Sequence, residues 1–334
     1  MKRIGLLLFL ALPILCSCRD LSLYAPEASL PPSSGKSSSY FSTSTARTES
    51  TAGEFPVSST TVCTTSPSGS PSAPEILAPS AVLYDATHDR MLFAKDETTR
   101  RYPASMTKLL TAAVALSYCE LDEVMTVGSE IYLIQPDSSV AYLRRGQQLS
   151  LSMLLDALLL PSGNDAAYVI AVNVGRMLAQ DETLSDKKAV AVFCRRMTAM
   201  AHEIGAENSQ FVNPDGYHDP EHYTTAADML KIAQFSMTFP AICEISARPA
   251  MTVSLVSGEE REWKNSNVLL NKDSPYYYPG AIGLKTGYTD EAGSCVAAVA
   301  QREENTLIAI VMGSASSGQR WRDTIRLFNY GFGE

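Results

Sequence analysis

The chain has 334 residues, of which 45% are apolar and 19% are charged, a composition typical of globular proteins. Its net charge of −9 and its pI near 5.1 disfavour nucleic acid as a partner, because binding to phosphates requires clustered Lys and Arg. The seven cysteines are widely spaced and none after Cys18 forms a C-x-x-C pair, so we expect neither a disulfide framework nor a zinc or redox site.

The N-terminal segment at 1–18 indicates the cellular compartment in which the protein works. Two basic residues precede an apolar run at 4–15 that is too short to span a bilayer but suits a signal peptide. The run ends in the letters LCSC, which resemble a bacterial lipobox. We therefore expect lipidation of Cys18 and tethering to the outer face of the cytoplasmic membrane, with a plain cleaved signal peptide as the alternative.

Residues 19–75 are predicted to form a flexible spacer. Ser, Thr, Pro and Gly dominate from Pro26 to Pro74, and so little apolar surface cannot offset the entropy lost on ordering the chain. Such a segment can hold a folded domain away from a membrane. The composition changes at Ile76, and we expect one folded domain over 76–334 with a sizeable core.

Apolar patterns within this domain predict strands at both ends and helices between them. Short apolar runs at 81–85 and 91–94 flank a turn-like segment and predict a β-hairpin. Two further strands are predicted at 294–301 and 306–313. Strands at both ends favour one mixed sheet in which the N- and C-terminal strands are adjacent. Helices are predicted at 105–117, 151–160, 166–178, 187–204, 228–239 (ended by Pro240) and 320–330.

The first candidate for chemistry is the segment Ser105-Met106-Thr107-Lys108. On a helix, residues three apart share a face, so the Ser105 hydroxyl and the Lys108 amine can meet. Serine becomes a good nucleophile only when a neighbour takes its proton, and lysine can do so only if its pKa is lowered. The following helix is apolar nearly all round, which predicts that Lys108 is buried. The pattern alone is a weak indication, since a surface lysine near a helix start would look the same.

A second polar segment, Ser162-Gly163-Asn164-Asp165, follows an apolar run. On a tight loop, Ser162 and Asn164 can point into one cavity. The segment would also serve as an ordinary turn, and we expect Asp165 to be the N-cap of the helix that begins near 166.

The third segment is Lys285-Thr286-Gly287. On a strand, Lys285 and Gly287 would lie on one side and Thr286 on the other, unless a bulge intervenes. A strand glycine permits close approach by a ligand, and Lys with Thr suits a carboxylate. An ordinary loop between strands is the alternative.

The order S-x-x-K, S-x-N, K-T-G is far more specific than any one segment. It resembles the signature of the serine penicillin-recognising enzymes. The flanking sequences resemble low-molecular-mass D-alanyl-D-alanine carboxypeptidases, and the resemblance covers about 79–331. The similar stretches are 103–112, 160–167, 211–220, 223–228 and 283–289.

The resemblance implies an α+β fold of the serine β-lactamase and DD-peptidase kind, with an antiparallel sheet flanked by helices and a mainly helical lobe. It implies a serine peptidase that removes the terminal D-alanine from peptidoglycan stem peptides through an acyl-enzyme on Ser105. It also implies that β-lactams are covalent inhibitors and that no cofactor is needed.

The resemblance assigns catalytic roles to the first two segments. Ser105 is the expected nucleophile and Lys108 its general base. Ser162 is expected to relay a proton to the leaving amine. Asn164 is expected to hold Lys108 and to hydrogen-bond the substrate backbone.

The resemblance assigns substrate binding to the third segment. Lys285 and Thr286 are expected to bind the terminal carboxylate beside Gly287. The backbone N–H groups of Ser105 and Tyr288 are the expected oxyanion hole. A positive Lys285 would also help to keep the base neutral.

The four histidines are expected to be loop or packing residues. A Pro between His218 and His222 breaks any helix there, so the two need not share a face. Their spacing does not match H-E-x-x-H, and we expect no metal.

Three alternatives use the same residues. A class A β-lactamase needs a Glu about three dozen residues after S-x-N, but residues 198–201 stand there and Glu203 falls in a predicted helix. A D,D-endopeptidase acting on cross-links stays open. An inactive peptidoglycan-binding lipoprotein is disfavoured because all motif residues are intact. Relatives often add a β-rich domain and an amphipathic C-terminal helix, and we expect neither here.

Overall fold

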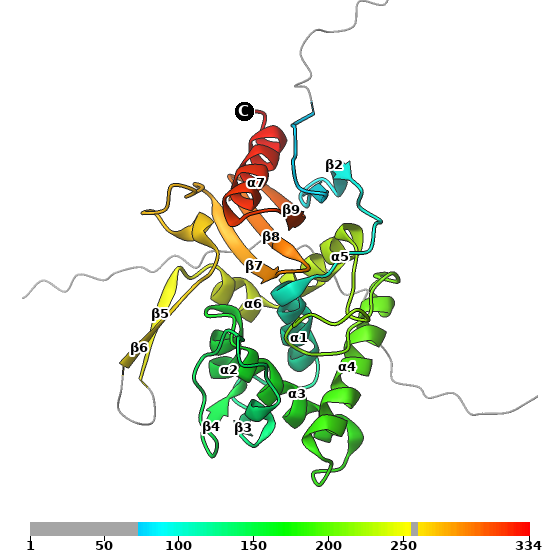
Figure 1. Cartoon of the computed structure of the whole chain (residues 1–334). Helices are drawn as coiled ribbons and strands as arrows, with labels where there is room; N and C mark the ends of the chain where they lie inside the picture. The colour runs from blue at the N-terminus through cyan, green and yellow to red at the C-terminus, as the bar shows by residue number, and fades with distance from the viewer. Residues whose placement is uncertain (1–72, 255–259) are drawn as a thin grey trace, which may run out of the picture. The chain divides into compact units, whose positions relative to one another are not determined.

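A computed structural model describes residues 73–254 and 260–334 (Figure 1). The predicted signal peptide, the lipidation site at Cys18 and nearly all of the predicted spacer lie outside the described residues. In the part that is described, no helix is both long and apolar enough to cross a membrane.

Five antiparallel strands form the main sheet: β1 (Ser80–Asp85), β2 (Arg90–Lys95), β7 (Ala281–Thr289), β8 (Gly293–Arg302) and β9 (Asn305–Ser314). Their order is β2-β1-β9-β8-β7, so the first and last strands of the domain are adjacent, as predicted. The N-terminal hairpin and the pair of C-terminal strands are confirmed as well. All pairings in this sheet are antiparallel, which corrects the expectation of a mixed sheet.

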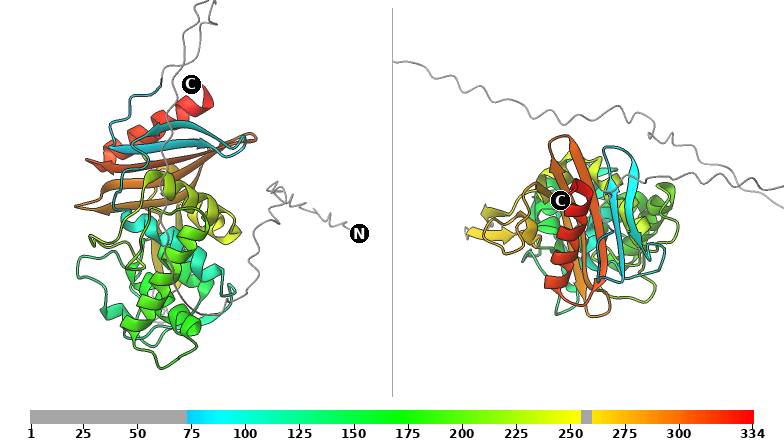
Figure 2. Two further views of the ribbon diagram at one scale, coloured as in Figure 1. Left: turned by 90° about the vertical axis from the view of Figure 1, so that its right-hand side faces the viewer. Right: turned by 90° about the horizontal axis from the view of Figure 1, so that it is seen from above.

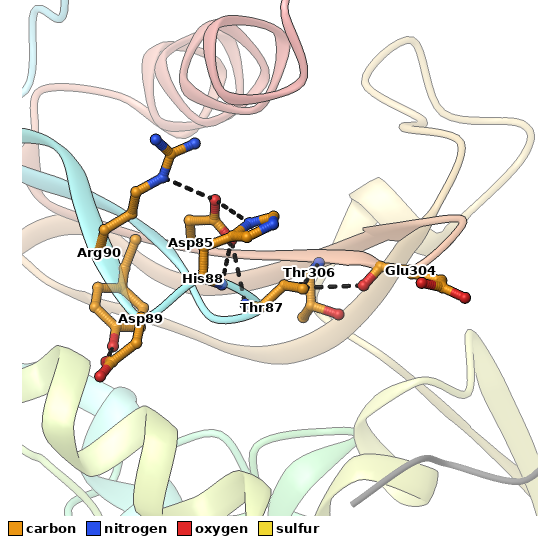
Figure 3. A network of polar contacts seen from close by, with 8 residues as sticks. Asp85, Thr87, His88, Asp89, Arg90, Glu304 and Thr306 are labelled. Carbon is orange, nitrogen blue, oxygen red and sulfur yellow. Dashed lines mark hydrogen bonds and ion pairs between the residues drawn. The ribbon is translucent and has the colours of Figure 1, made fainter. Parts of the chain in front are cut away.

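Polar contacts at the end of the sheet tie two turns together (Figure 3). The buried Asp85 carboxylate accepts hydrogen bonds from two backbone N–H groups of the β1–β2 turn, and its Oδ2 contacts His88 Nδ1 at 2.9 Å. Thr87 Oγ1 donates to the carbonyl of Glu304 and accepts from the N–H of Thr306. These contacts satisfy the buried carboxylate and fix the hairpin against the β8–β9 turn.

The predicted helices are confirmed with small changes at their ends. Pro240 begins α6 and does not itself end the preceding helix, which stops at Met237; the first helical position suits proline because its N–H is not needed there. The helices are η1 (Ala104–Met106), α1 (Thr107–Leu116), η2 (Glu130–Tyr132), α2 (Leu151–Leu159), α3 (Asn164–Ala179), α4 (Asp186–Glu203), α5 (Ala226–Met237), α6 (Pro240–Ser246), η3 (Val268–Leu270) and α7 (Ser317–Phe332).

Two small hairpins were not predicted. β3 (Val124–Thr126) pairs with β4 (Gln148–Ser150), and β5 (Ala250–Ser254) pairs with β6 (Glu260–Lys264). The first two strands are too short to give an alternating pattern in the sequence. The β5–β6 hairpin projects beside the helical lobe (Figure 1).

Helices cover both faces of the main sheet (Figure 2). α7 packs on one face, and α5 and α6 connect the other face to the helical lobe. Along β8, Val296 and Ala298 belong to the core beneath α7, whereas Ala297 and Val299 belong to the larger core toward the lobe. The sheet is therefore apolar on both sides, and the protein has the predicted α+β fold.

α1 lies inside this larger core, as its nearly continuous apolar sequence predicts. All of its residues from Thr107 to Ala115 are buried, and it packs against α2, α3, α4 and α5. Its N-terminal end lies near the sheet, beside β7. Polar side chains at this end are therefore held in fixed positions by the surrounding core.

Candidate active site

Ser105 and Lys108 meet at the start of α1. Ser105 lies in the short helix η1 and Lys108 in the first turn of α1, and the Nζ–Oγ distance is 2.8 Å. Lys108 is fully buried, so the predicted burial is confirmed. Its amine also contacts Asn164 Oδ1 at 2.7 Å and the carbonyl oxygen of Asp215 at 2.8 Å.

This geometry suits Lys108 in either protonation state. A lysine ammonium has three N–H donors, and the three acceptors around Nζ match that number. A neutral amine keeps two N–H groups for Asn164 and Asp215, and its lone pair can accept the hydroxyl proton of Ser105. A proton can therefore pass from serine to lysine without rearrangement of the heavy atoms.

Burial lowers the pKa of Lys108 to about 8, and the nearby negative charges of Asp215 and Asp165 act in the opposite direction. Burial is thus the largest cause of this shift, and the effect of Lys285 on the base stays a prediction. With a pKa of about 8, a substantial fraction of the amine is neutral at mildly alkaline pH.

The segment around Ser162 is held by strained backbone and by the helix that follows it. Ser162 has a left-handed backbone with φ of 62°, which is uncommon for a residue with a side chain. Its side chain is only 8% exposed, and within the described residues its hydroxyl has no hydrogen-bond partner. The side chain is therefore available to a bound molecule.

Asn164 links the lysine to a neighbouring loop. Its Oδ1 accepts from Lys108, its Nδ2 donates to Ser138 Oγ at 2.9 Å, and its backbone N–H donates to the carbonyl of Ser139. One side-chain N–H remains for the substrate backbone, the contact that we expected of this residue.

Asp165 has a different role from the one we predicted. The N-cap residue of α3 is Gly163, and Asp165 lies in the first helical turn. The Asp165 carboxylate accepts from the backbone N–H groups of Ala141 and Leu143, both at 2.9 Å. It therefore fixes the loop before β4, a role that depends on a distant segment and has no local sequence signal.

The third segment lies on the edge strand β7. Gly287 is packed against the start of η1, since a Cβ there would lie 2.7 Å from the carbonyl oxygen of Pro103 and 3.0 Å from the nitrogen of Ser105. Only glycine lets the strand run this close to Ser105. The Thr286 hydroxyl contacts that of Ser266, and Tyr288 is exposed.

Lys285 is almost completely buried beneath this strand. Its Nζ donates to the carbonyl of Thr286 at 3.1 Å. Burial, and then the positive charges of Lys108 and Arg320, hold its pKa well below the usual range. An arriving carboxylate would favour the charged form of Lys285.

Two further residues at this site carry no motif in the sequence. The carbonyl of Asp215 accepts from Lys108, and the turn continues into Gly216, where a Cβ would lie 1.9 Å from the carbonyl oxygen of Ala104. Arg320 of α7 is 7% exposed and donates through Nη1 to the carbonyls of Gly287 and Cys295. The letters N-P-D-G at 213–216 predict a turn at Asp215 but not the contact with Lys108. No sequence pattern marks Arg320.

The histidines do not form a serine–histidine pair. His222 is buried, its Nδ1 accepts from the N–H of Val212, and its Nε2 therefore donates to Thr107 Oγ1 at 2.8 Å. Burial lowers the pKa of His222 to about 3, so the ring is neutral and structural, in line with the packing role expected for it. His218 packs edge-on against Tyr102 and, in contrast, reaches the cleft.

One cleft of about 510 Å³ brings most of these residues together. Lys108 and Lys285 lie buried behind its surface. Within the described residues, no group of three or more His, Cys, Asp or Glu could hold a metal ion. Among the residues that line the cleft are Ser105, Ser138, Ser162, Asn164, Gly216, Tyr217, His218, Ser266, Thr286, Gly287, Tyr288 and Arg320.

Sequence comparisons connect this site to known proteins. Residues 68–316 match the model of the peptidase S11 family, D-alanyl-D-alanine carboxypeptidase. A D-alanyl-D-alanine carboxypeptidase of Streptomyces sp. (strain K15) is 35% identical over 254 residues, which cover 72% of this chain and 82% of that protein. DacB2 of Mycobacterium tuberculosis is 32% identical over 272 residues, covering 80% and 86%.

Solved structures agree with these matches. The crystal structure of the Streptomyces K15 DD-transpeptidase superposes with a TM-score of 0.70 at 32% identity, covering 78% of this chain and 99% of that one. The D-alanyl-D-alanine carboxypeptidase DacD from Francisella tularensis gives a TM-score of 0.67 at 24% identity, a likeness of fold.

Proposed function

Because the chain belongs to the peptidase S11 family of D-alanyl-D-alanine carboxypeptidases, we propose that it removes the terminal D-alanine from peptidoglycan stem peptides. The observation that carries the proposal is the 2.8 Å contact between the Ser105 hydroxyl and the fully buried amine of Lys108. A nucleophile beside a base of lowered pKa is what acyl transfer requires.

Acylation begins when Ser105 Oγ attacks the carbonyl carbon of the penultimate D-alanine and its proton passes to Lys108. The negative charge that develops on the carbonyl oxygen is stabilised by the N–H groups of Ser105 and Tyr288. The close approach of Gly287 to the Ser105 nitrogen supports this oxyanion hole. The peptide bond then breaks as the proton on Lys108 is relayed through Ser162 to the departing amine of D-alanine, which leaves Lys108 neutral and Ser162 unchanged.

The terminal carboxylate of the substrate is bound by Lys285, Thr286 and the strand that carries them. A carboxylate near Lys285 favours its charged form, and this charge in turn favours the neutral form of Lys108. The carboxylate and the charged Lys285 together form a pair without net charge beside Lys108. Arg320 adds a second positive charge to the same part of the cleft.

Deacylation uses the same groups with water as the nucleophile. Lys108 accepts a proton from water, which attacks the ester on Ser105, and the serine leaves with a proton. The product is the stem peptide shortened by one residue. β-Lactams would form the corresponding ester on Ser105 and so inhibit the enzyme.

The proposal is tested by incubating the purified protein with a pentapeptide ending in D-Ala-D-Ala and measuring free D-alanine. Ser105→Ala should abolish both D-alanine release and labelling by a fluorescent penicillin. Ser152→Ala, a serine of α2 that does not line the cleft, is the matched control and should retain both. Unchanged release from Ser105→Ala would disprove the assignment of the nucleophile.

A transpeptidase is the second candidate, because the Streptomyces K15 structure that superposes on this chain is called a DD-transpeptidase. In that reaction an amine, and not water, attacks the ester on Ser105. Adding glycylglycine to the assay separates the two: a new amide-linked product at the expense of the shortened peptide indicates transfer. A D,D-endopeptidase would instead hydrolyse the cross-link of dimers and release two separate peptides.

A β-lactamase is disfavoured by the position of its required glutamate. Glu203 pairs with Arg196 at 2.6 Å on α4, and neither residue lines the cleft. We therefore propose a long-lived penicilloyl ester. Rapid turnover of penicillin by the purified domain would contradict this.

We further propose that the chain is exported and tethered through Cys18, which would place the domain beside peptidoglycan. The lipobox-like letters at 15–18 support this. Cys18→Ser should release the protein from the membrane fraction of a bacterial host. Retention of Cys18→Ser in that fraction would exclude the lipid anchor.

A further inference from the structure

Three basic side chains lie at the bottom of the cleft. Lys108, Lys285 and Arg320 are 0%, 1% and 7% exposed, and they lie around the nucleophile. In the proposed reaction they meet the reacting carbonyl and the terminal carboxylate. Ser162, a residue that is only 8% exposed, also faces this region of the cleft, and its hydroxyl has no hydrogen-bond partner in the described part of the chain.

Negative charge is concentrated at the outer edge of the same cleft. Asp137, Asp290 and Glu291 all line the cleft and are all exposed. We call these three residues the acidic rim. Asp137 lies on the loop between η2 and β4, and the other two lie in the turn between β7 and β8. Two separate parts of the fold therefore contribute carboxylates to one opening.

Tyrosine and histidine side chains, and no Lys or Arg, are the described partners of the acidic rim. Tyr217 OH donates to the Asp137 carboxylate at 3.2 Å, and Tyr288 OH donates to Asp290 at 2.7 Å. Glu291 lies 3.8 Å from His218 Nδ1, beyond hydrogen-bond distance. No Lys or Arg in the described residues pairs with any of the three. The tyrosines orient the carboxylates without neutralising them.

We propose that the acidic rim binds a free side-chain ammonium on the third residue of the stem peptide, so that the enzyme prefers peptides that are not cross-linked through that amine. This inference rests on the proposed function. With the terminal carboxylate beside Lys285 and Arg320, the third residue lies two residues back along the chain, nearer the opening. A diamino acid there carries its ammonium toward exposed carboxylates, and acylation of the amine removes the charge.

The matched probes are Nα-acetyl-L-Lys-D-Ala-D-Ala, with a free ε-amine, and Nα,Nε-diacetyl-L-Lys-D-Ala-D-Ala. Each is hydrolysed by the wild-type domain, and kcat/KM is measured from released D-alanine. We expect the free-amine peptide to be preferred roughly fivefold or more at low salt, since each exposed ion pair contributes only a factor of a few. The preference should shrink in about 0.5 M NaCl because exposed charges are screened.

The test variant is Asp137→Asn/Asp290→Asn/Glu291→Gln, which should bring the ratio of the two kcat/KM values close to one. The control, Glu120→Gln/Asp122→Asn/Glu182→Gln, changes net charge equally at exposed positions that do not line the cleft, and it should keep the wild-type ratio. Labelling by fluorescent penicillin checks that each variant is folded. If the triple variant is not labelled, the ratio of the two kcat/KM values is measured for the single variant Asp137→Asn, in which it should fall part of the way toward one.

The outcomes separate the two proposals. Equal kcat/KM values for the two peptides with the wild-type protein overturn the inference and leave the proposed function standing. A preference that persists in the rim variant, or disappears equally in the control, also overturns the inference. Release of D-alanine from neither peptide overturns the proposed function, and the inference with it.

Discussion

The buried floor of the cleft and its exposed rim are built from different kinds of segment. Floor residues such as Lys108 and Lys285 lie on regular elements surrounded by core, and Lys108 is hydrogen-bonded to Ser105 and Asn164. Rim residues lie on loops and are exposed. A rigid floor suits bond-breaking, which demands fixed distances, whereas exposed loops can vary the ligands that they accept. Changes to the floor should therefore affect every substrate, and changes to the rim should affect the choice between substrates.

The largest effect is expected from Lys108→Met. Methionine fills a similar volume but cannot accept the serine proton, and general-base catalysis contributes about a hundredfold to ten-thousandfold. We expect kcat/KM for both acetylated peptides, and the rate of penicillin labelling, to fall by about a thousandfold. A loss confined to one peptide would contradict the distinction between floor and rim.

Gly287→Ala should also reduce acylation, by about a hundredfold, because the new Cβ would push β7 away from the Ser105 nitrogen and so spoil the oxyanion hole. The rate of penicillin labelling is the measurement. Gly146→Ala is the control: its φ of 88° is unfavourable for alanine, yet nothing lies within 4 Å. It should lower the melting temperature and leave labelling unchanged. Equal labelling rates for the two variants would contradict the proposed approach of the strand.

The pH dependence of kcat/KM should report the pKa of Lys108. The amine must be neutral to act as a base, so kcat/KM should rise with pH up to about 8 and fall as the pH drops below it. The Asp215 charge raises the pKa of Lys108. Asp215→Asn should therefore move the acid limb of the profile, the range in which kcat/KM rises with pH, to lower pH. Relative to its own plateau, the variant should be several-fold more active near pH 6 than wild type.

Asp215→Asn retains an oxygen for the N–H of Tyr217, which the Asp215 side chain accepts at 3.2 Å. A purely structural role would therefore lower the plateau without moving the limb. An unshifted limb would show that the Asp215 charge does not act on Lys108.

The smallest effect is expected from Tyr217→Phe, which removes the hydroxyl that orients Asp137 and leaves the carboxylate in place. We expect KM for the free-amine peptide to rise about twofold to threefold, with little change in kcat. KM for the diacetylated peptide should not change. Equal increases in KM for both peptides would mean that Tyr217 contacts the shared part of the substrate.

Most residues of the cleft floor could be predicted from the sequence, because the residues of each motif lie within a few positions of one another in the chain. Ser105 and Lys108 are one helical turn apart, and the apolar sequence after them predicts their burial. The Asp215 acceptor could not be predicted in this way, because a backbone carbonyl has no characteristic side chain. Arg320 lies in an ordinary amphipathic helix, and its role depends on the packing of that helix against the sheet.

Differences in the fold have similar causes. The local pattern at Asp165 favours a helix cap, whereas its carboxylate accepts from the N–H groups of Ala141 and Leu143. Pro240 was read only as a helix breaker, although proline also suits a first turn. Local sequence patterns thus predict which helices and strands form. Contacts between distant segments decide where these elements end and which partners their terminal residues bind.

The amide of Asn164 connects the two parts of the cleft. One end of this side chain accepts from the amine of Lys108, and the other donates to Ser138, the neighbour of Asp137. The position of the loop that carries Asp137 is therefore tied to the position of the amine through one planar group. Loss of this side chain would remove a support from the floor and from the rim at once.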